Sequence, residues 1–428
     1  MFKKHAPKLF LFNLQYLDED FEDAGISSNE TDRIPSVLFV RRFDLFCFVI
    51  AILSYLCDFL SDVVVGTSHM IQGRYLTGVL ILLFAFVPSL ILNIVSFIWV
   101  LDDTTFWNKK FQRRRKGLQD TTNDADYKPF MSLQMVALVC IAQMGPLLWY
   151  FKAIHHGLNY RSTNSVLKKR EAFCKMVEAE RDATLLRFFE AYLESAPQLI
   201  IQGTVIADFF LSYRYHGTQL PIWVYLQCIS MIISCVSISW SIVVQNRSLR
   251  MVQEHKVNLW PHEAVLQFIW RFLTVSSRLL VVAVAVLYFK QWTFLFLGGH
   301  LFASLFHIMV LQSISIEGIN SFESALLCIN AFIHTFTPFN MAEGQTRYRY
   351  AIAYALEFVE MTALFAYISA DIVHEPLLQI GELIAFGGFL LGIITMIVYH
   401  GCFHPSKREE PQPQPTVEMV EIRSLTAM

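Results

Sequence analysis

Long apolar segments recur along the chain, and they limit its possible folds more than any other feature. A helix needs about 20 apolar residues to cross the hydrocarbon core of a bilayer. Ten windows of about this size lie between clusters of charged residues, at 43–65, 76–101, 131–152, 183–207, 222–246, 264–289, 292–312, 322–340, 348–370 and 376–400. Because lipid offers no hydrogen-bond partner to an open backbone, these segments are predicted to be helices.

The composition also indicates a membrane protein. Of the 428 residues, 54% are hydrophobic and only 16% are charged, whereas a soluble domain carries about 25% charged residues. The sequence predicts an all-α polytopic membrane protein with three parts. These are a cytoplasmic regulatory tail at 1–42, a multi-span domain at 43–403 and a disordered cytoplasmic tail at 404–428. The net charge of −2 gives no indication of nucleic-acid binding.

No motif in the sequence indicates an enzyme or a metal site. The eight cysteines form no CxxC pair, and the 13 histidines show no zinc-ligand spacing. A phosphate-binding loop, a GxSxG elbow and the protein-kinase motifs are also missing from the sequence. We therefore expect neither enzymatic catalysis nor ATP-driven pumping, and no cofactor or metal.

The positions of Lys and Arg predict which loops face the cytoplasm, where these residues concentrate. Basic clusters lie at 3–8, 41–42, 109–116, 161–175, 247–256, 347–349 and 407–408. Segment 131–152 lies between two of these clusters, so we expect that it does not cross the membrane. Its Gly145-Pro146 interruption suits a re-entrant helix, whose broken backbone is covered by protein.

In the second half of the chain, three apolar segments lie between the basic clusters at 247–256 and 347–349. An odd number of crossings cannot join two loops on the same side of the membrane. Only one of the segments 292–312 and 322–340 can be a full span, and we choose the second as re-entrant because it is short and ends at Pro338. The prediction is therefore about eight transmembrane helices and two re-entrant or partly inserted helices, with both termini cytoplasmic. The matching positions of the two unusual segments suggest an internal pseudo-repeat.

Charged side chains occur inside the apolar segments, where each costs about 2.5–3.5 kcal/mol on insertion scales. Asp44, Asp58 and Asp62 share one face of the first segment at helical spacing. Later segments carry further polar residues, namely Arg187, Glu190, Glu194, Gln198, Gln202, Arg271, Arg278, Glu357 and Glu360. Two interpretations stay open: buried ion pairs that lock the bundle, such as Arg278 with Asp58 or Glu194, and a polar track for a charged or zwitterionic group.

The N-terminal tail contains an acidic run, Asp18-Glu-Asp-Phe-Glu-Asp-Ala-Gly25. Within it, Asp20, Asp23 and Ala24 have the arrangement that a caspase accepts, with Asp at the cut, a second Asp three residues earlier and a small residue just after. Acidic runs are also common in solvated linkers. The tail from His404 onward has no Asp, so any such switch is expected at the N-terminus.

One stretch of the sequence indicates a family. The residues from Glu178 to Gln202 resemble the hallmark sequence of the XK family, which comprises the Kell-associated membrane proteins and their scramblase relatives. The three-aspartate first segment, the helix with two arginines and the exit Phe403-His-Pro405 fit the same family, and the resemblance covers 35–405. Residues 245–263 and 339–350 are most similar to the nematode cell-death member.

The resemblance implies a phospholipid scramblase of the plasma membrane that exposes phosphatidylserine on dying cells after caspase cleavage. Many vertebrate relatives are cut in the C-terminal tail, so the lack of Asp there makes cleavage after Asp23 the expected switch. The charged lipid path of the family falls on Asp44, Asp58, Asp62, Arg74, Arg187, Glu190, Glu194 and Arg278, to which we add Arg271.

Two other functions remain open at this point. A solute or amino-acid transporter could use the same charges at the midplane, and a membrane scaffold for a partner protein could use them only to hold its fold. The expected partners are phospholipids, especially phosphatidylserine, and a caspase. A single-span membrane subunit or a second copy of the chain in a homodimer is also possible.

Overall fold

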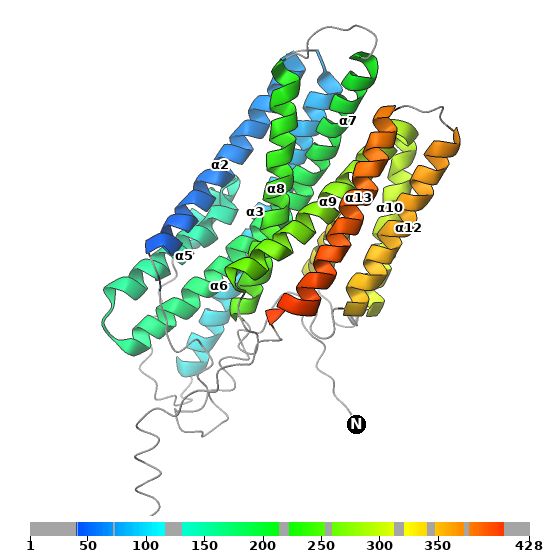
Figure 1. Cartoon of the computed structure of the whole chain (residues 1–428). Coiled ribbons are helices and arrows are strands. Elements are labelled where there is room, and N and C mark those ends of the chain that lie inside the picture. Colours follow the sequence, from blue (N-terminus) through cyan, green and yellow to red (C-terminus); the bar gives the residue numbers. More distant parts are fainter. Residues whose placement is uncertain are drawn as a thin grey trace, which may run out of the picture.

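The computed structural model describes residues 40, 42–71, 73–115, 131–213, 222–252, 259–311, 321–339, 347–371 and 376–405. Every regular element in these ranges is helical (Figure 1). The predicted caspase residues Asp20, Asp23 and Ala24 lie outside the described residues, as does the side chain of Asp44. The predicted tails therefore stay predictions.

Helices and helical turns make up the described chain from end to end. In chain order they are α2 (Arg42–Ile71), α3 (Tyr75–Arg115), α4 (Leu133–Ile141), α5 (Gly145–Ser162), α6 (Val166–Glu190), the π-helical turn η1 (Ala191–Ser195), α7 (Ala196–Tyr213), α8 (Ile222–Val252), α9 (Pro261–Phe289), the 3-10 turn η2 (Lys290–Trp292), α10 (Thr293–Leu311), α11 (Ser321–His334), α12 (Arg347–Asp371), α13 (Pro376–Val398) and the π-helical turn η3 (Tyr399–Phe403).

Six stretches of the described chain are long and apolar enough to cross a membrane. They are Leu45–Ile71, Tyr75–Leu101, Gln227–Met251, Pro261–Met309, Tyr348–Ala370 and Gln379–Phe403, of which Pro261–Met309 contains both α9 and α10. The prediction of an all-α polytopic membrane protein is confirmed. The count of eight crossings stays a prediction.

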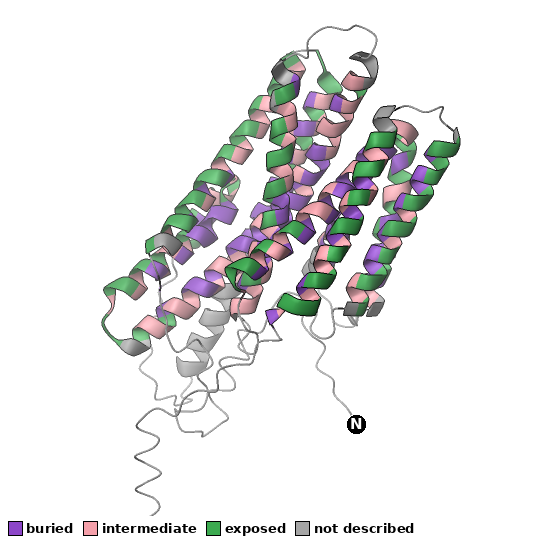
Figure 2. Cartoon of the chain, in the orientation of Figure 1, coloured by how far each residue is buried: buried purple, intermediate pink, exposed green. Residues whose placement is uncertain are grey.

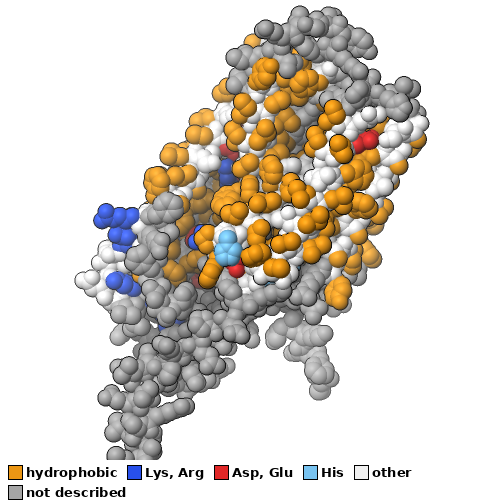
Figure 3. Space-filling model, viewed as in Figure 1, with side chains coloured by type: hydrophobic (Ala, Val, Ile, Leu, Met, Phe, Trp, Pro, Cys, Tyr) orange, Lys and Arg blue, Asp and Glu red, His pale blue; other side chains and the backbone are white. Residues whose placement is uncertain are grey.

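The helices form two groups that share α9. One apolar core lies among α2, α3, α5, α6, α7 and α8, and a second lies among α9, α12 and α13. Figure 2 shows that the buried residues line the inward faces of the helices, while the outward faces are largely exposed. Those outward faces are covered by hydrophobic side chains (Figure 3). An exposed apolar surface of this extent is what lipid contact requires.

The predicted interruption at Gly145-Pro146 is present, and polar side chains from neighbouring helices satisfy its backbone. Gln143 between α4 and α5 has a positive φ of 61°, and its carbonyl oxygen accepts a hydrogen bond from the Tyr55 hydroxyl at 3.0 Å. The Gly145 N–H donates to Asn93 Oδ1 at 2.7 Å, and the Gly145 oxygen accepts from Ser96 Oγ at 2.9 Å. A broken helix is tolerated in a membrane when protein groups replace its lost hydrogen bonds.

The second interrupted segment is held by cationic side chains. Helix α11 ends at His334, and the chain continues through buried, non-helical residues to Phe339. Arg278 Nε donates to the Thr335 oxygen at 2.9 Å, and Arg271 Nη1 donates to the Pro338 oxygen at 2.8 Å. The last carbonyl groups of a helix have no partner within it and carry partial negative charge, so two guanidinium groups stabilise this buried end.

Gly145 offers a direct test of the first interruption. An added Cβ would lie 2.6 Å from Asn93 Oδ1 and 3.2 Å from Ser96 Cβ, so Gly145→Ala should disturb both hydrogen bonds. We expect a destabilisation of about 1–3 kcal/mol, seen as a lower thermal midpoint of the purified protein in detergent. Gly298→Ala on α10 is the control, because nothing lies within 4 Å of its added Cβ. Equal thermal midpoints for the two variants would contradict this account of the interruption.

Candidate functional site

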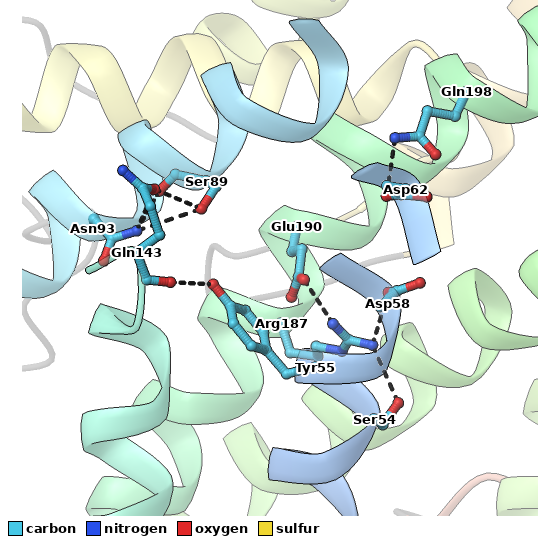
Figure 4. Close-up of polar contacts among 10 residues, drawn as sticks. All are labelled: Ser54, Tyr55, Asp58, Asp62, Ser89, Asn93, Gln143, Arg187, Glu190 and Gln198. Carbon is cyan, nitrogen blue, oxygen red and sulfur yellow. Dashed lines mark hydrogen bonds and ion pairs between the residues drawn. The ribbon is translucent and has the colours of Figure 1, made fainter. Parts of the chain in front are cut away.

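Arg187 on α6 is the centre of a charged cluster between α6 and α2. Its Nη2 lies 3.1 Å from Asp58 Oδ2 and donates to Ser54 Oγ at 3.4 Å, and its Nη1 lies 2.7 Å from Glu190 Oε1 (Figure 4). The local sequence explains the arrangement, since Arg187 and Glu190 are three residues apart on one helix face. Ser54 and Asp58 are four residues apart on α2, so both of them face the same arginine.

The Arg187 cluster is open to the surroundings at mid-depth. Asp58 lies at the middle of the apolar stretch Leu45–Ile71. Its side chain is 40% exposed and that of Arg187 is 20% exposed, whereas the side chain of Glu190 is buried. Ser54 and Ser61, on the same face of α2, are exposed as well. An accessible ion pair halfway along a spanning helix can exchange partners with a charged group that arrives from outside the protein.

A second polar group lies one to two turns further along the same helices. Gln198 Nε2 on α7 donates to Asp62 Oδ2 at 3.0 Å, and the buried Glu194 carboxyl lies near Asp62. The π-helical turn Ala191–Ser195, which carries Glu194, lies between Arg187 and Gln198. Pro197 explains the turn, because its missing N–H and its ring disturb the helical hydrogen bond to the carbonyl four residues earlier. Such turns occur frequently at functional sites.

A further ion pair lies on α6 before Arg187. Arg181 Nη2 lies 2.7 Å from Asp182 Oδ1, and both side chains are partly exposed. The three polar groups follow one another along α6, η1 and α7 from Asp182 to Gln198, which corresponds to about 25 Å at the helical rise, and Arg181 and Asp182 lie about 120–140° around the helix axis from Arg187. We call this row of side chains the α6–α7 track. Its length is close to the hydrocarbon thickness of about 30 Å.

Arg278 belongs to a different cluster. Among the described residues, the acid that pairs with it is Glu360 on α12, with Nη2 to Oε2 at 2.9 Å. His300 Nδ1 on α10 lies 3.0 Å from the same arginine nitrogen and 2.7 Å from Glu360 Oε1. The side chain of Arg278 is only 2% exposed and that of Glu360 is 16% exposed. The suggested pairing of Arg278 with Asp58 or Glu194 is therefore wrong, because α9 turns this face toward α10 and α12.

Arg271 is fully buried and is held by neutral groups. Its Nη1 donates to Thr337 Oγ1 at 3.0 Å, its Nη2 donates to the Tyr350 hydroxyl at 2.9 Å, and its guanidinium carbon lies 4.2 Å from the centre of the Trp270 ring. With its bond to the Pro338 oxygen, these contacts fix the irregular segment after α11. The contacts of Arg271 are therefore those of a residue that supports the fold.

Two other predicted site residues lie apart from the Arg187 cluster. Arg74 sits in the connection between α2 and α3, where its N–H donates to the His69 oxygen at 3.0 Å. It lies beyond the end of α2, whereas Asp44 lies near the beginning of that helix. The structure thus brings Asp58, Asp62, Arg187, Glu190 and Glu194 together, and it places Arg271 and Arg278 elsewhere.

Sequence reasoning missed two kinds of contributor. His300 was overlooked although a histidine within the apolar segment 292–312 is itself a signal, since ionisable groups inside a span usually have a partner. Tyr350 was overlooked because a tyrosine in a helix gives no sign of which cation it will contact. Across the described ranges, no group of three or more His, Cys, Asp and Glu side chains could hold a metal ion.

The fold and the α6–α7 track define a multi-pass membrane protein whose charged side chains are arranged in rows within the membrane domain. The sequence profile of the family described as XK-related protein matches residues 46–405, and the chain belongs to this family. Cell death abnormality protein 8 of Caenorhabditis briggsae is 48% identical over 422 residues, covering 98% of this chain and 90% of the relative. The Caenorhabditis elegans protein of the same name is 48% identical over 410 residues, covering 95% and 88%. The family resemblance seen in the sequence is confirmed.

The two charged clusters should respond differently to neutralisation. Arg278→Gln removes the buried guanidinium and leaves the mostly buried Glu360 with His300 as its remaining partner. Breaking a buried ion pair typically destabilises a protein by about 3–5 kcal/mol. We expect a large fall in thermal midpoint or poor recovery of the protein. Asp58→Asn changes a partly exposed pair, for which about 0–1 kcal/mol is typical.

A double variant keeps the comparison informative if Arg278→Gln does not fold. Arg278→Gln with Glu360→Gln removes both charges, so it should recover part of the lost stability relative to the single variant. Detergent thermal melts of the four proteins, wild type included, give the comparison. Similar midpoints for Arg278→Gln and Asp58→Asn would contradict the distinction between a buried and an accessible cluster.

Proposed function

We propose that this chain is a phospholipid scramblase of the plasma membrane. Headgroups would pass between the leaflets along the α6–α7 track and the facing side of α2, while the acyl chains stay in the bilayer. No energy source is needed, because exchange in both directions follows the concentration of each lipid. The observation that carries the proposal is the accessible Arg187–Asp58 ion pair at the middle of a spanning stretch.

The chemistry of the track suits a zwitterionic or anionic headgroup. A phosphate can replace Asp58 at the Arg187 guanidinium, and an amine can replace Arg187 at Asp58 or Glu190. Since the track offers paired charges of both signs, no single site needs to hold the headgroup tightly. The polar groups from Asp182 to Gln198 then provide successive contacts, each lowering the cost of moving a charge through the apolar layer.

The relatives support a role in dying cells. Both carry the name cell death abnormality protein 8, and the identity extends over nearly the whole chain. We infer that scrambling exposes phosphatidylserine during apoptosis, and that a caspase starts it by cutting after Asp23. Both termini would then be cytoplasmic, and residues 1–23 would keep the path closed until they are removed.

The contacts at the two interruptions give less support to a solute transporter. In many transporters the free backbone groups of broken helices coordinate the substrate or ion. Here Gly145 N–H and the oxygens of Gly145, Thr335 and Pro338 are already bound by side chains of the same chain. An inert scaffold remains the simpler rival, and activity measurements on the purified protein separate it from a scramblase.

Neutralising the Arg187 cluster should slow lipid exchange. Asp58→Asn and Arg187→Gln each remove a charge-assisted contact, typically about 1.5–3 kcal/mol, so we expect at least about a tenfold lower rate of labelled-lipid exchange in vesicles. Glu382→Gln on α13 is the control, since its carboxylate contacts Ser369 and lies far along the chain from the track. Wild-type rates in both cluster variants would refute the assigned path.

The cleavage switch has its own test. Asp23→Ala should abolish caspase-triggered exposure of phosphatidylserine on cells while the amount of protein at the surface stays unchanged. Asp32→Ala, in the same tail but without an Asp three residues earlier, should behave as wild type. Annexin binding after induced apoptosis gives the readout. Normal exposure by Asp23→Ala would rule out this switch without affecting the assigned path.

A further inference from the structure

We propose that the end of the α5–α6 hairpin is a docking surface for anionic phospholipid headgroups, of the phosphatidylserine type, in the leaflet from which the track starts. Its effect on lipid exchange rests on the proposed function, whereas the surface itself does not. Helices α5 and α6 pack against each other as an antiparallel pair joined by residues 163–165. Figure 1 shows this pair extending to one lower corner of the molecule.

The charge at this end is strongly one-sided. Residues 152–175 contain six basic side chains, Lys152, Arg161, Lys168, Lys169, Arg170 and Lys175, and one acidic side chain, Glu171. Glu171 is paired with Lys175 on the next turn. Lys168 is exposed, and Lys169 Nζ lies 5.9 Å from the centre of the Tyr160 ring. Figure 3 shows Lys and Arg side chains gathered in this part of the molecule.

An apolar stripe leads to the basic end along the same hairpin. Phe151 and Leu158 are seven residues apart on one face of α5, and Met144, seven residues before Phe151, directly precedes the helix; all three are exposed. The stripe continues on the neighbouring α4 with exposed Leu138 and Ile141. An exposed apolar face next to a cluster of Lys and Arg is the arrangement of helices that lie in the bilayer interface. The stripe would contact acyl chains while the basic end contacts phosphates.

The hairpin connects the basic end with the track. Helix α6 begins at Val166 next to the basic residues and carries the Arg181–Asp182 pair about 20 Å further along, at the helical rise. Basic residues beside a membrane raise the local concentration of anionic lipid. A phosphatidylserine headgroup held at Lys168 and Lys169 would therefore lie on the helix that leads to the first step of the track.

An acidic peptide is the competing occupant, since the chain's own run at 18–23 is rich in carboxylates. The exposed Phe151 and Leu158 favour lipid, because they belong to the apolar outer surface of the bundle, which would contact acyl chains. The position of the basic end on the side predicted to face the cytoplasm also places it beside the leaflet that holds anionic lipid. We therefore assign the surface to lipid and leave the peptide as an outcome of the test.

The test uses the full chain in vesicles that contain a photoreactive phosphatidylserine or phosphatidylcholine probe, with the reactive group near the headgroup. Mass spectrometry then locates the labelled peptides. We expect labelling within 158–175 to be about fivefold stronger with the phosphatidylserine probe, and to fall to the phosphatidylcholine level in Lys168→Gln/Lys169→Gln. The control Lys290→Gln, an exposed basic residue at the end of α9, should leave the labelling unchanged.

Three outcomes would overturn the proposal. These are equal labelling by the two probes, labelling that the double substitution does not reduce, and labelling that appears only when residues 1–23 are removed, which would assign the surface to the acidic tail. The labelling requires no lipid exchange. A chain that is labelled as expected but scrambles no lipid would therefore support the surface and refute the proposed function.

Discussion

The absence of water from the bilayer interior decides where the polar groups of this chain lie. Each interrupted helix must satisfy its free backbone groups with other parts of the protein, and the two interruptions do so with different chemistry. Neutral side chains, chiefly those of Asn93 and Ser96, bind the backbone of the turn before α5. Two guanidinium groups, Arg271 and Arg278, hold the chain after α11. Both interruptions contact the helices that line the two cores. They therefore constrain where the spanning helices lie.

The same constraint separates the charges into two kinds. A buried charge such as Arg278, which is paired with Glu360, is removed only at a large loss of stability. The pair of Arg187 and Asp58 is compensated too, but its side chains remain partly exposed at mid-depth. Their partial exposure leaves the pair accessible to a charged group from outside the protein. The exposure is what gives the α6–α7 track its proposed role in carrying headgroups.

Much of this organisation could be predicted from the sequence, and the limits have a physical cause. Apolar length predicted the helices, and Gly145-Pro146 marked the first interruption. The spacing of Arg187 and Glu190 placed them on one face, but helical periodicity says nothing about how a helix is rotated against its neighbours. Arg278 was therefore matched with the wrong acids, and Arg271 was placed on a path although its partners are hydroxyl and carbonyl groups. Those partners lie 66 to 83 positions away along the chain, beyond the reach of local patterns.

The central claim is that the chain itself moves lipid between leaflets. The most direct measurement is a leaflet-accessibility assay on purified protein that lacks residues 1–23, in vesicles carrying a fluorescent lipid in both leaflets. Dithionite bleaches only the outer leaflet, so vesicles without exchange keep half of their signal. If the chain exchanges lipid, nearly all of the signal is lost, without ATP or an ion gradient. Retention of the inner half, by protein that is folded and inserted, would contradict this claim.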